Sequence, residues 1–269
     1  MKQNKKPLNF LSVIVPAYKQ EKTIKMNIKR LRTVLDSLKI SYELIVVVDG
    51  KIDKTFQKAQ EIESSTTKIV GYEHNHGKGY AVRFGMANSK GNIIAFLDAG
   101  MDLDPKSIIL LLELLEKENA DIVIGSKLHP LSKVNYPIQR KLLSWGYRSL
   151  VKLMFDLSVR DTQVGLKIYK KNVLQDVLPR LLVKTFAFDI EMLAVAHHIG
   201  YTKILEAPIE LKYAKWSSIT SKNFWMIIYR MVWDTLAVFY RLRILHYYDT
   251  NSKRKWRYDP ELNFRINLG

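Results

Sequence analysis

The 269-residue chain contains no cysteine, which excludes disulfide bonds, thiolate catalysis and zinc–thiolate sites. It also has no internal repeat, no low-complexity segment and no uninterrupted apolar run long enough to span a bilayer. The apolar run at residues 10–15, behind a basic N-terminus, ends at Pro16 and is too short for a signal peptide. With 47% hydrophobic residues, the chain can bury a full core as one large or two small domains.

Acidic residues are scarce relative to basic ones, with 26 Asp and Glu against 43 Lys and Arg and a formal net charge of +17. A positive field of this size attracts nucleic acid, anionic lipid or phosphorylated substrates. The basic residues are spread widely, and no helix-turn-helix, zinc or ribonucleoprotein signature accompanies them. We therefore expect no nucleic-acid partner and look first to phosphate groups and membranes.

Short apolar runs alternate with amphipathic stretches through the first half of the chain. Strands are predicted at residues 8–15, 42–48, 67–72, 93–97 and 122–125, and helices at residues 23–38, 53–63, 80–87 and 107–118. Strict alternation of this kind predicts an α/β fold, with a mostly parallel sheet flanked by helices.

The run at residues 93–97 is the clearest buried strand, because it is short, unbroken and rich in β-branched and aromatic residues. Three carboxylates follow it: Asp98, Asp102 and Asp104. Ligands of open α/β sheets bind outside the carboxyl ends of the strands, where carboxylates can hold a hard divalent cation. Asp104 is better explained as the cap of a helix beginning near Pro105. Asp98 sits at the strand end itself.

Other polar residues follow the remaining strands and helices, and a parallel sheet would place them along the same edge: Tyr18, Glu21, Asp49, Lys78, Ser126 and Lys127. From the residues alone, Asp49 is equally explained as a nucleotide ligand and as a turn-former before Gly50. The glycine-flanked Lys78 can meet a phosphate, although a basic turn is the simpler interpretation.

The chain resembles the family 2 inverting glycosyltransferases, which have the Rossmann-like GT-A fold. The matching segments are residues 13–18, 46–50 with Asp53 and Thr55, 75–79, 96–99, 160–169 and 188–193. The resemblance covers roughly residues 8 to 213. Within the family it is greatest to the enzymes that glycosylate dolichyl or other polyprenyl phosphates, and the segment around Asp161 indicates this branch. The sequence of residues 161–163 is slightly more similar to that of the glucosyl-transferring enzymes than to that of the mannosyl-transferring enzymes.

This resemblance implies inverting transfer of a hexose from a UDP- or GDP-sugar to a polyprenyl or dolichyl phosphate, with Mg²⁺ or Mn²⁺ as cofactor. The implied donor-nucleotide residues are Pro16, Tyr18, Glu21, Asp49, Lys78 and Asp98, and the implied catalytic residues are Asp161, Gln163, Asp189 and Glu191. Asp189 is explained equally well as a helix N-cap.

The chain also departs from the family pattern. Lys19 and Gln20 stand where Asn and Glu are usual, and the paired acids before Gly50 are reduced to a single Asp49. Gly100 replaces the second acid of the Asp-x-Asp motif, so the predicted metal ligands are Asp98 and Asp102. Mg²⁺ commonly takes one or two protein carboxylates and completes its shell with phosphate and water, so two are sufficient.

An acceptor phosphate is already anionic at neutral pH and needs cationic residues to orient it rather than a strong base. Lys127 and Arg140 are the candidates for this contact. A glycosyltransferase acting on a sugar hydroxyl would instead need a carboxylate base, for which Asp161, Asp189 and Glu191 are available. A non-catalytic module that binds a nucleotide sugar or a membrane is a further alternative, because the Asp-x-Asp motif is broken.

Two stretches, residues 140–155 and 223–248, are amphipathic and rich in aromatic residues. Each can lie in the interface of an anionic membrane or pack on the domain or in a dimer. The prediction is a glycosyltransferase domain at 8–215, an interface segment at 216–249 and a basic tail at 250–269, peripheral to the cytoplasmic membrane face.

Overall fold

The computed structural model describes residues 10–134, 138–185, 187–211, 224–249, 256–260 and 264–267. Within helix α5, the side chains of residues 138–145 lie outside this description. The predicted domain boundary at residue 215 falls between described segments and stays a prediction.

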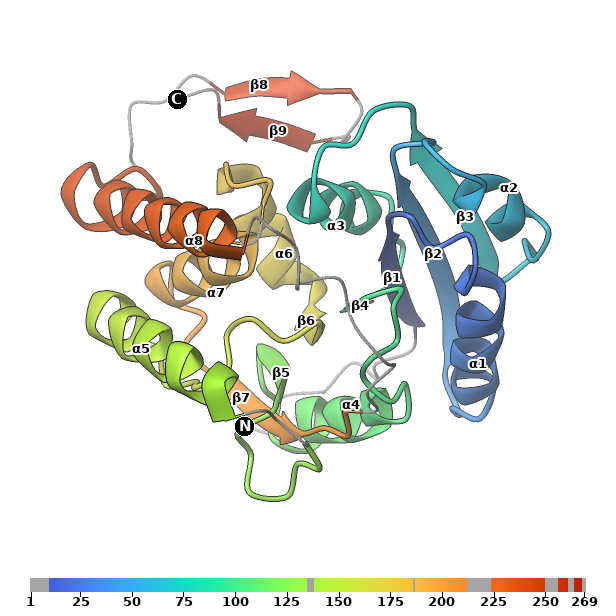
Figure 1. Cartoon of the computed structure of the whole chain (residues 1–269), viewed down its shortest axis with the longest axis horizontal. Coiled ribbons are helices and arrows are strands. Elements are labelled where there is room, and N and C mark those ends of the chain that lie inside the picture. Colours follow the sequence, from blue (N-terminus) through green and yellow to red (C-terminus); the bar gives the residue numbers. More distant parts are fainter. Residues whose placement is uncertain are drawn as a thin grey trace, which may run out of the picture.

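A seven-stranded sheet in the order β3-β2-β1-β4-β6-β5-β7 forms the centre of the molecule (Figure 1). Its strands are β1 (Phe10–Ala17), β2 (Ser41–Asp49), β3 (Thr67–Tyr72), β4 (Ile93–Leu97), β5 (Ile122–Ser126), β6 (Leu166–Lys170) and β7 (Ile204–Pro208). Strand β6 is antiparallel to both neighbours, and every other pair in this sheet is parallel. The prediction of a mostly parallel α/β sheet is confirmed.

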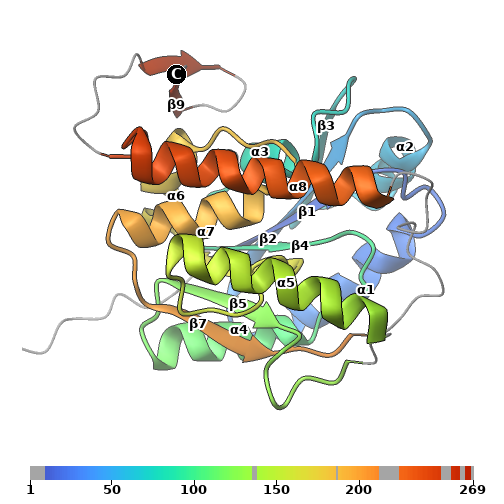
Figure 2. The same ribbon diagram turned by 60° about the vertical axis from the view of Figure 1, so that its left-hand side comes forward.

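The helices are α1 (Ile24–Asp36), α2 (Thr55–Gln60), α3 (Lys78–Ala87), α4 (Ser107–Lys117), α5 (Ile138–Phe155), α6 (Lys171–Val177), α7 (Phe188–His198) and α8 (Phe224–Phe239). A 3₁₀ turn, η1 (Leu178–Arg180), follows α6, and a π-helix, η2 (Tyr240–Ile244), extends α8. Figures 1 and 2 show α4 beneath the β5–β7 end of the sheet and α6, α7 and α8 above it.

All four predicted helices differ from the observed ones at one end or both, and two of these differences have a local cause. The stretch predicted at 53–63 is helical only over α2, because the Asp53 carboxylate accepts the Thr55 N–H and so begins the helix later. Helix α3 begins at Lys78 rather than Tyr80, directly after Gly77, whose φ of 95° suits glycine.

The strand directions bring the predicted site residues to one edge of the sheet. Strands β1, β2 and β4 are parallel, and the two successive reversals at β6 give β5 the direction of β4. The carboxyl ends at Ala17, Asp49, Leu97 and Ser126 therefore share an edge, as predicted from the alternation.

Helix α8 packs against α5 and α7 rather than standing apart from the domain. Its inner face buries Thr235 and Val238, and Leu242 and Tyr248 continue that face into the core. In the described part of the chain, no helix is both long and apolar enough to span a bilayer.

The basic tail contains an unpredicted antiparallel hairpin of β8 (Trp256–Asp259) and β9 (Phe264–Asn267).

The close packing of α3 on the sheet predicts a glycine requirement at position 85. A Cβ added there would lie 2.2 Å from Ile14 Cγ2, whereas one added at Gly146 in α5 meets nothing within 4 Å. We expect Gly85→Ala to lower the free energy of unfolding by about 1–3 kcal/mol. Gly146→Ala should raise it by about 0.5–1 kcal/mol, because alanine reduces the entropy of the unfolded chain. Urea denaturation of both variants measures this difference, and equal effects would contradict the packing argument.

Candidate active site

A tight turn after β4 presents the carboxylates that the sequence predicts as metal ligands. The Met101 N–H donates to the Asp98 carbonyl (3.1 Å), and Met101 adopts a φ of 52°, which curls the chain back. Buried Asn27 of α1 donates its Nδ2 to the carbonyl of Ala99 (2.8 Å) and so holds the turn from below. Asp98 Oδ2 packs so closely on Gly165 that a Cβ there would lie 2.2 Å from it.

Asp98 and Asp102 form a pair of neighbouring like charges. The Asp98 side chain is 47% exposed at the strand end, whereas Asp102 is half-buried. Burial and then the charge of Asp98 raise the pKa of Asp102. A divalent cation would relieve this repulsion, and Gly100 leaves open space beside it, so the pair fits a metal held partly by ligand oxygens. Among the residues that the structure describes, no three His, Cys, Asp or Glu side chains gather into a fuller metal site.

Two lysines and Asp189 extend this site into the sheet. Lys78 Nζ lies 3.0 Å from Asp98 Oδ1 and 3.7 Å from Asp189 Oδ2. The fully buried Lys167 of β6 lies 2.5 Å from Asp189 Oδ1 and donates to the Val164 carbonyl (2.6 Å). Asp189 is thus shared by two ammonium groups.

The pKa values of the two lysines shift in opposite directions. Burial lowers the pKa of Lys167, and this is only partly offset by Asp189. Burial also lowers the pKa of Lys78, but the charges of Asp98 and Asp189 outweigh it, and the net pKa of Lys78 is raised. Lys78 is therefore positively charged beside Asp98, the first predicted metal ligand.

Asp49 supports the loop that carries Lys78. Its carboxylate accepts the N–H groups of His76 (2.8 Å) and Gly77 (3.0 Å) and the side-chain amide of Asn75 (2.8 Å). Asp49 is buried by these contacts. It organises residues 75–77, and its role in nucleotide binding stays a prediction.

The other predicted donor residues lie along the end of β1 and beyond it. Pro16 is within β1, and its carbonyl accepts the Ala99 N–H (3.3 Å). Tyr18 is exposed, with Lys19 Nζ 5.3 Å from its ring centroid. Glu21 is engaged elsewhere, because it accepts the Lys54 N–H (3.2 Å) at the start of α2.

Asp161 and Lys127 are brought together at the end of β5. The Asp161 carboxylate accepts the Lys127 N–H at 2.8 Å, and Lys127 Nζ lies 3.6 Å from its other oxygen. Arg140, the second predicted acceptor contact, belongs to α5, but its side chain lies outside the described residues.

Glu191 is not brought to this site. It is 0% exposed and accepts the N–H groups of Leu182 (3.1 Å) and Val183 (2.9 Å), the Tyr248 hydroxyl (2.6 Å) and Arg241 (3.2 Å). Burial raises the pKa of Glu191, and these bonds partly offset the rise.

The N-cap explanation of Asp189 is wrong, because the cap position of α7 is Ala187 and Asp189 lies in the first turn.

Another predicted catalytic residue, Gln163, packs against helix α5. Its Nε2 is buried without a hydrogen-bond partner of ordinary geometry, although Gln163 lies beside the Tyr147 hydroxyl of α5. Tyr147 in turn bonds Thr235 of α8 (2.9 Å), and burial raises the pKa of Tyr147 to about 12.

Two residues of this site received no role from the sequence. Asn27 stands within the apolar stripe of α1, between Ile24 and Leu31, and a polar residue there was a readable signal. Lys167 lies inside a strand that is otherwise buried, which was a similar signal. Neither signal identifies the residue that the side chain contacts, because Ala99 and Asp189 come from distant parts of the chain.

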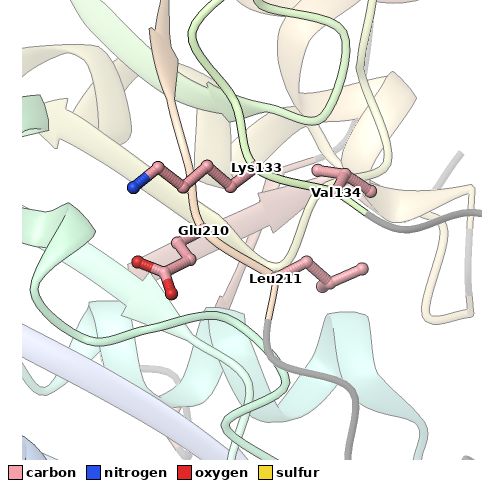
Figure 3. Close-up of a pocket in the computed structure, with 4 residues that line it drawn as sticks. All are labelled: Lys133, Val134, Glu210 and Leu211. Carbon is pink, nitrogen blue, oxygen red and sulfur yellow. The ribbon is translucent and has the colours of Figure 1, made fainter.

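A pocket with a volume of about 230 Å³ lies beyond β7, between Lys133, Val134, Glu210 and Leu211 (Figure 3). The side chains of Lys133 and Glu210 extend to the same side of the two segments. Leu211 pairs with Leu103, the residue after Asp102. None of the four lining residues was predicted from the sequence.

The chain is similar to known glycosyltransferases. The family model described as "Glycosyl transferase family 2" matches residues 12–178. Dolichyl-phosphate beta-glucosyltransferase of Homo sapiens is 31% identical over 260 residues, covering 89% of this chain and 77% of that protein. The enzyme of the same name from Dictyostelium discoideum is 28% identical over 222 residues, covering 74% of this chain and 66% of its own length.

The solved structures that resemble the chain have the same fold. Glucosyl-3-phosphoglycerate synthase from Mycobacterium tuberculosis, in complex with Mn²⁺, UDP-glucose and phosphoglyceric acid, has a TM-score of 0.66 at 19% identity, covering 86% of this chain and 80% of that one. In complex with UDP alone it covers 96% and 87%, with a TM-score of 0.65 at 17% identity. The match over more than half of the chain, and the seven-stranded sheet that carries it, mean that this protein belongs to glycosyl transferase family 2 and is a glycosyltransferase of the GT-A fold.

Proposed function

We propose that the chain transfers glucose from UDP-glucose to a dolichyl or other polyprenyl phosphate, with inversion, at the cytoplasmic face of a membrane. The observation that carries this proposal is the cluster of Asp98, Asp102, Lys78 and Asp189 at the carboxyl edge of the sheet. The polyprenyl acceptor and the glucosyl group follow the relatives named above, and UDP follows the solved neighbours.

On the donor side, Asp98 and Asp102 would hold Mg²⁺ or Mn²⁺. When bound, the ion supplies positive charge against the diphosphate leaving group. Lys78 adds a second positive charge at the same place, since its ammonium already lies at Asp98. Its glycine-flanked loop, held by Asp49, presents a lysine that suits a diphosphate. Gln163 stays a predicted catalytic residue on the family resemblance alone.

On the acceptor side, the carboxylates are already engaged, which favours a phosphate over a sugar hydroxyl. Asp189 is held by two lysines, Asp161 by Lys127, and Glu191 is enclosed by its hydrogen bonds. None of these three is free to act as the base that a hydroxyl needs. A phosphate oxygen needs no base, and Lys127, loosely paired at 3.6 Å, can exchange its partner for an acceptor phosphate. Family membership also favours catalysis over the non-catalytic module.

The acceptor's lipid tail requires a membrane, and α8 offers a surface for it. Opposite its buried face, α8 and η2 expose a row of large side chains: Met226, Tyr229, Trp233, Leu236, Tyr240 and Ile244. On the neighbouring helix α5, Leu153 is also exposed. An aromatic and aliphatic row on a strongly basic protein suits the interface of an anionic bilayer, where the proposed polyprenyl phosphate acceptor would reside.

The substrate assignment predicts labelled lipid. The protein is incubated with radiolabelled UDP-glucose, or separately with labelled GDP-mannose, together with polyprenyl phosphate and Mg²⁺, Mn²⁺ or a chelator. We expect label in the extracted lipid only with UDP-glucose and a metal ion. Lipid label from GDP-mannose instead would change the assigned sugar to mannose. No lipid label under any condition would refute a polyprenyl phosphate acceptor.

The metal assignment predicts a graded loss of activity among three neighbouring carboxylates. We expect Asp98→Asn to lower kcat/KM by about 100-fold or more. Asp102→Asn should lower it by about 10–100-fold and raise the metal concentration needed for half-maximal activity. Asp104→Asn is the control, because Asp104 pairs with Arg30 (3.2 Å) and the Lys106 N–H (3.1 Å). Equal losses in the Asp104 and Asp102 variants would argue against the assigned ligands.

The membrane assignment predicts that two side chains of α8 control lipid binding. Tyr229 and Trp233 are 66% and 62% exposed, and burying each in a bilayer contributes about 1.5–3 kcal/mol. The double variant Tyr229→Ser/Trp233→Ser should therefore bind phosphatidylserine vesicles at least about tenfold more weakly in a sedimentation assay. Met26→Ser serves as the control, because Met26 is also 66% exposed but belongs to α1. Equal binding by both variants would refute the proposed surface.

A further inference from the structure

Residues 181–185, between η1 and α7, support the loop that carries Lys78. The carbonyl of Lys184 accepts the Gly79 N–H at 3.0 Å. The same carbonyl lies 2.5 Å from where a Cβ on Gly77 would stand, so the two segments touch directly. Lys184 Nζ also lies 5.8 Å from the ring centroid of Tyr80. The position of residues 77–79 therefore depends on the position of residues 181–185.

That segment is in turn held by the C-terminal part of the chain. Glu191 accepts the backbone N–H groups of Leu182 and Val183, and Tyr248 (2.6 Å) and Arg241 (3.2 Å) donate to the same carboxylate. Arg241 also donates to the Tyr248 hydroxyl (3.1 Å), which closes the network.

A second tether joins the same segment to α8. The hydroxyl of Thr185 donates to Asp234 Oδ2 at 2.6 Å. The C-terminal part of the chain thus holds residues 181–185 near both ends, once through Glu191 and once directly.

We propose that Asp234, Arg241 and Tyr248 are positioning residues for the donor site: they fix residues 181–185, and through them the turn from which Lys78 reaches Asp98. The identification of the ligand as a nucleotide diphosphate rests on the proposed function, whereas the mechanical connection does not. Glu191, which resembled a catalytic acid, is the centre of this connection. Because it is a buried carboxylate, losing one donor leaves it under-satisfied, and the segment that it holds becomes less ordered.

Conservative substitutions test the two tethers separately. Tyr248→Phe keeps the buried ring and removes the bond to Glu191, and Thr185→Val removes the bond to Asp234 while Thr185→Ser keeps it. The matched control is Asp249→Asn, because Asp249 is adjacent to Tyr248 but pairs with His198 (2.5 Å) and His246 (3.3 Å) instead. Two quantities are measured: hydrogen exchange of the peptide covering residues 74–80, and the steady-state constants with UDP-glucose and polyprenyl phosphate.

We expect Tyr248→Phe and Thr185→Val each to speed exchange in that peptide and to raise KM for the donor about fivefold or more, with KM for the acceptor unchanged. Thr185→Ser and Asp249→Asn should resemble the unmodified protein in both quantities. A general loss of stability would instead raise exchange throughout the chain and affect Asp249→Asn equally.

Unchanged exchange at residues 74–80 in both tether variants would overturn the proposal, as would an equal change in Asp249→Asn. If Tyr248→Phe does not fold, the Thr185 pair decides alone, because Thr185 is exposed. If the unmodified protein transfers no glucose, the proposed function fails, but the exchange experiment still tests whether the C-terminal residues position the Lys78 turn.

Discussion

The sharing of Asp189 between Lys167 and Lys78 is the interaction on which the rest of the site depends. A fully buried lysine is costly, and Lys167 is tolerated in the sheet only because Asp189 and the Val164 carbonyl meet it. Asp189 leaves its second oxygen toward Lys78, which also contacts Asp98. A chain of alternating charges therefore leads from the interior of β6 to the open end of β4, and each member holds the next in place.

This chain of charges explains why the loops around it are so strongly supported. Lys78 can be shared between Asp98 and Asp189 only if its loop is held accurately, and Asp49 provides three hydrogen bonds for that purpose. Asn27 likewise stabilises the turn that carries Asp98 and Asp102 through a side-chain hydrogen bond. Such supports are typical of sites whose geometry must be preorganised, because each loose side chain would otherwise lose entropy on binding.

The C-terminal segment belongs physically to the catalytic domain. Helix α8 buries one face against α5 and α7, and its continuation reaches Glu191 in the first turn of α7. The inner face of this helix packs on the domain, as one of the two interpretations expected, and its outer face carries the exposed aromatic side chains on which the membrane proposal rests. A helix with two such faces joins the surface proposed for the lipid to Thr185 and Glu191.

Local pattern was sufficient to predict several parts of the molecule, because they depend on neighbours in the chain. The strands at β3 and β4 coincide with their predicted ranges, and the end of β4 at Asp98 was located from the run of apolar residues alone. The common edge of β1, β2, β4 and β5 followed from strict alternation, since parallel strands linked by helices end on the same side. The roles of Asp49 and Glu191 could not be predicted in this way, because an acid before a glycine or in a helix looks the same whether it meets a ligand or a backbone N–H.

The sequence by itself determined the α/β architecture, the family and the edge at which the chemistry lies, because periodicity, turn residues and motif order are local properties. Only the tertiary structure decided which charges meet. Lys167 and Asp189 are separated by 22 residues, Glu191 and Tyr248 by 57, and Asp49 and Gly77 by 28. Such partners are chosen by sheet register and helix packing, and no pattern within either segment specifies them.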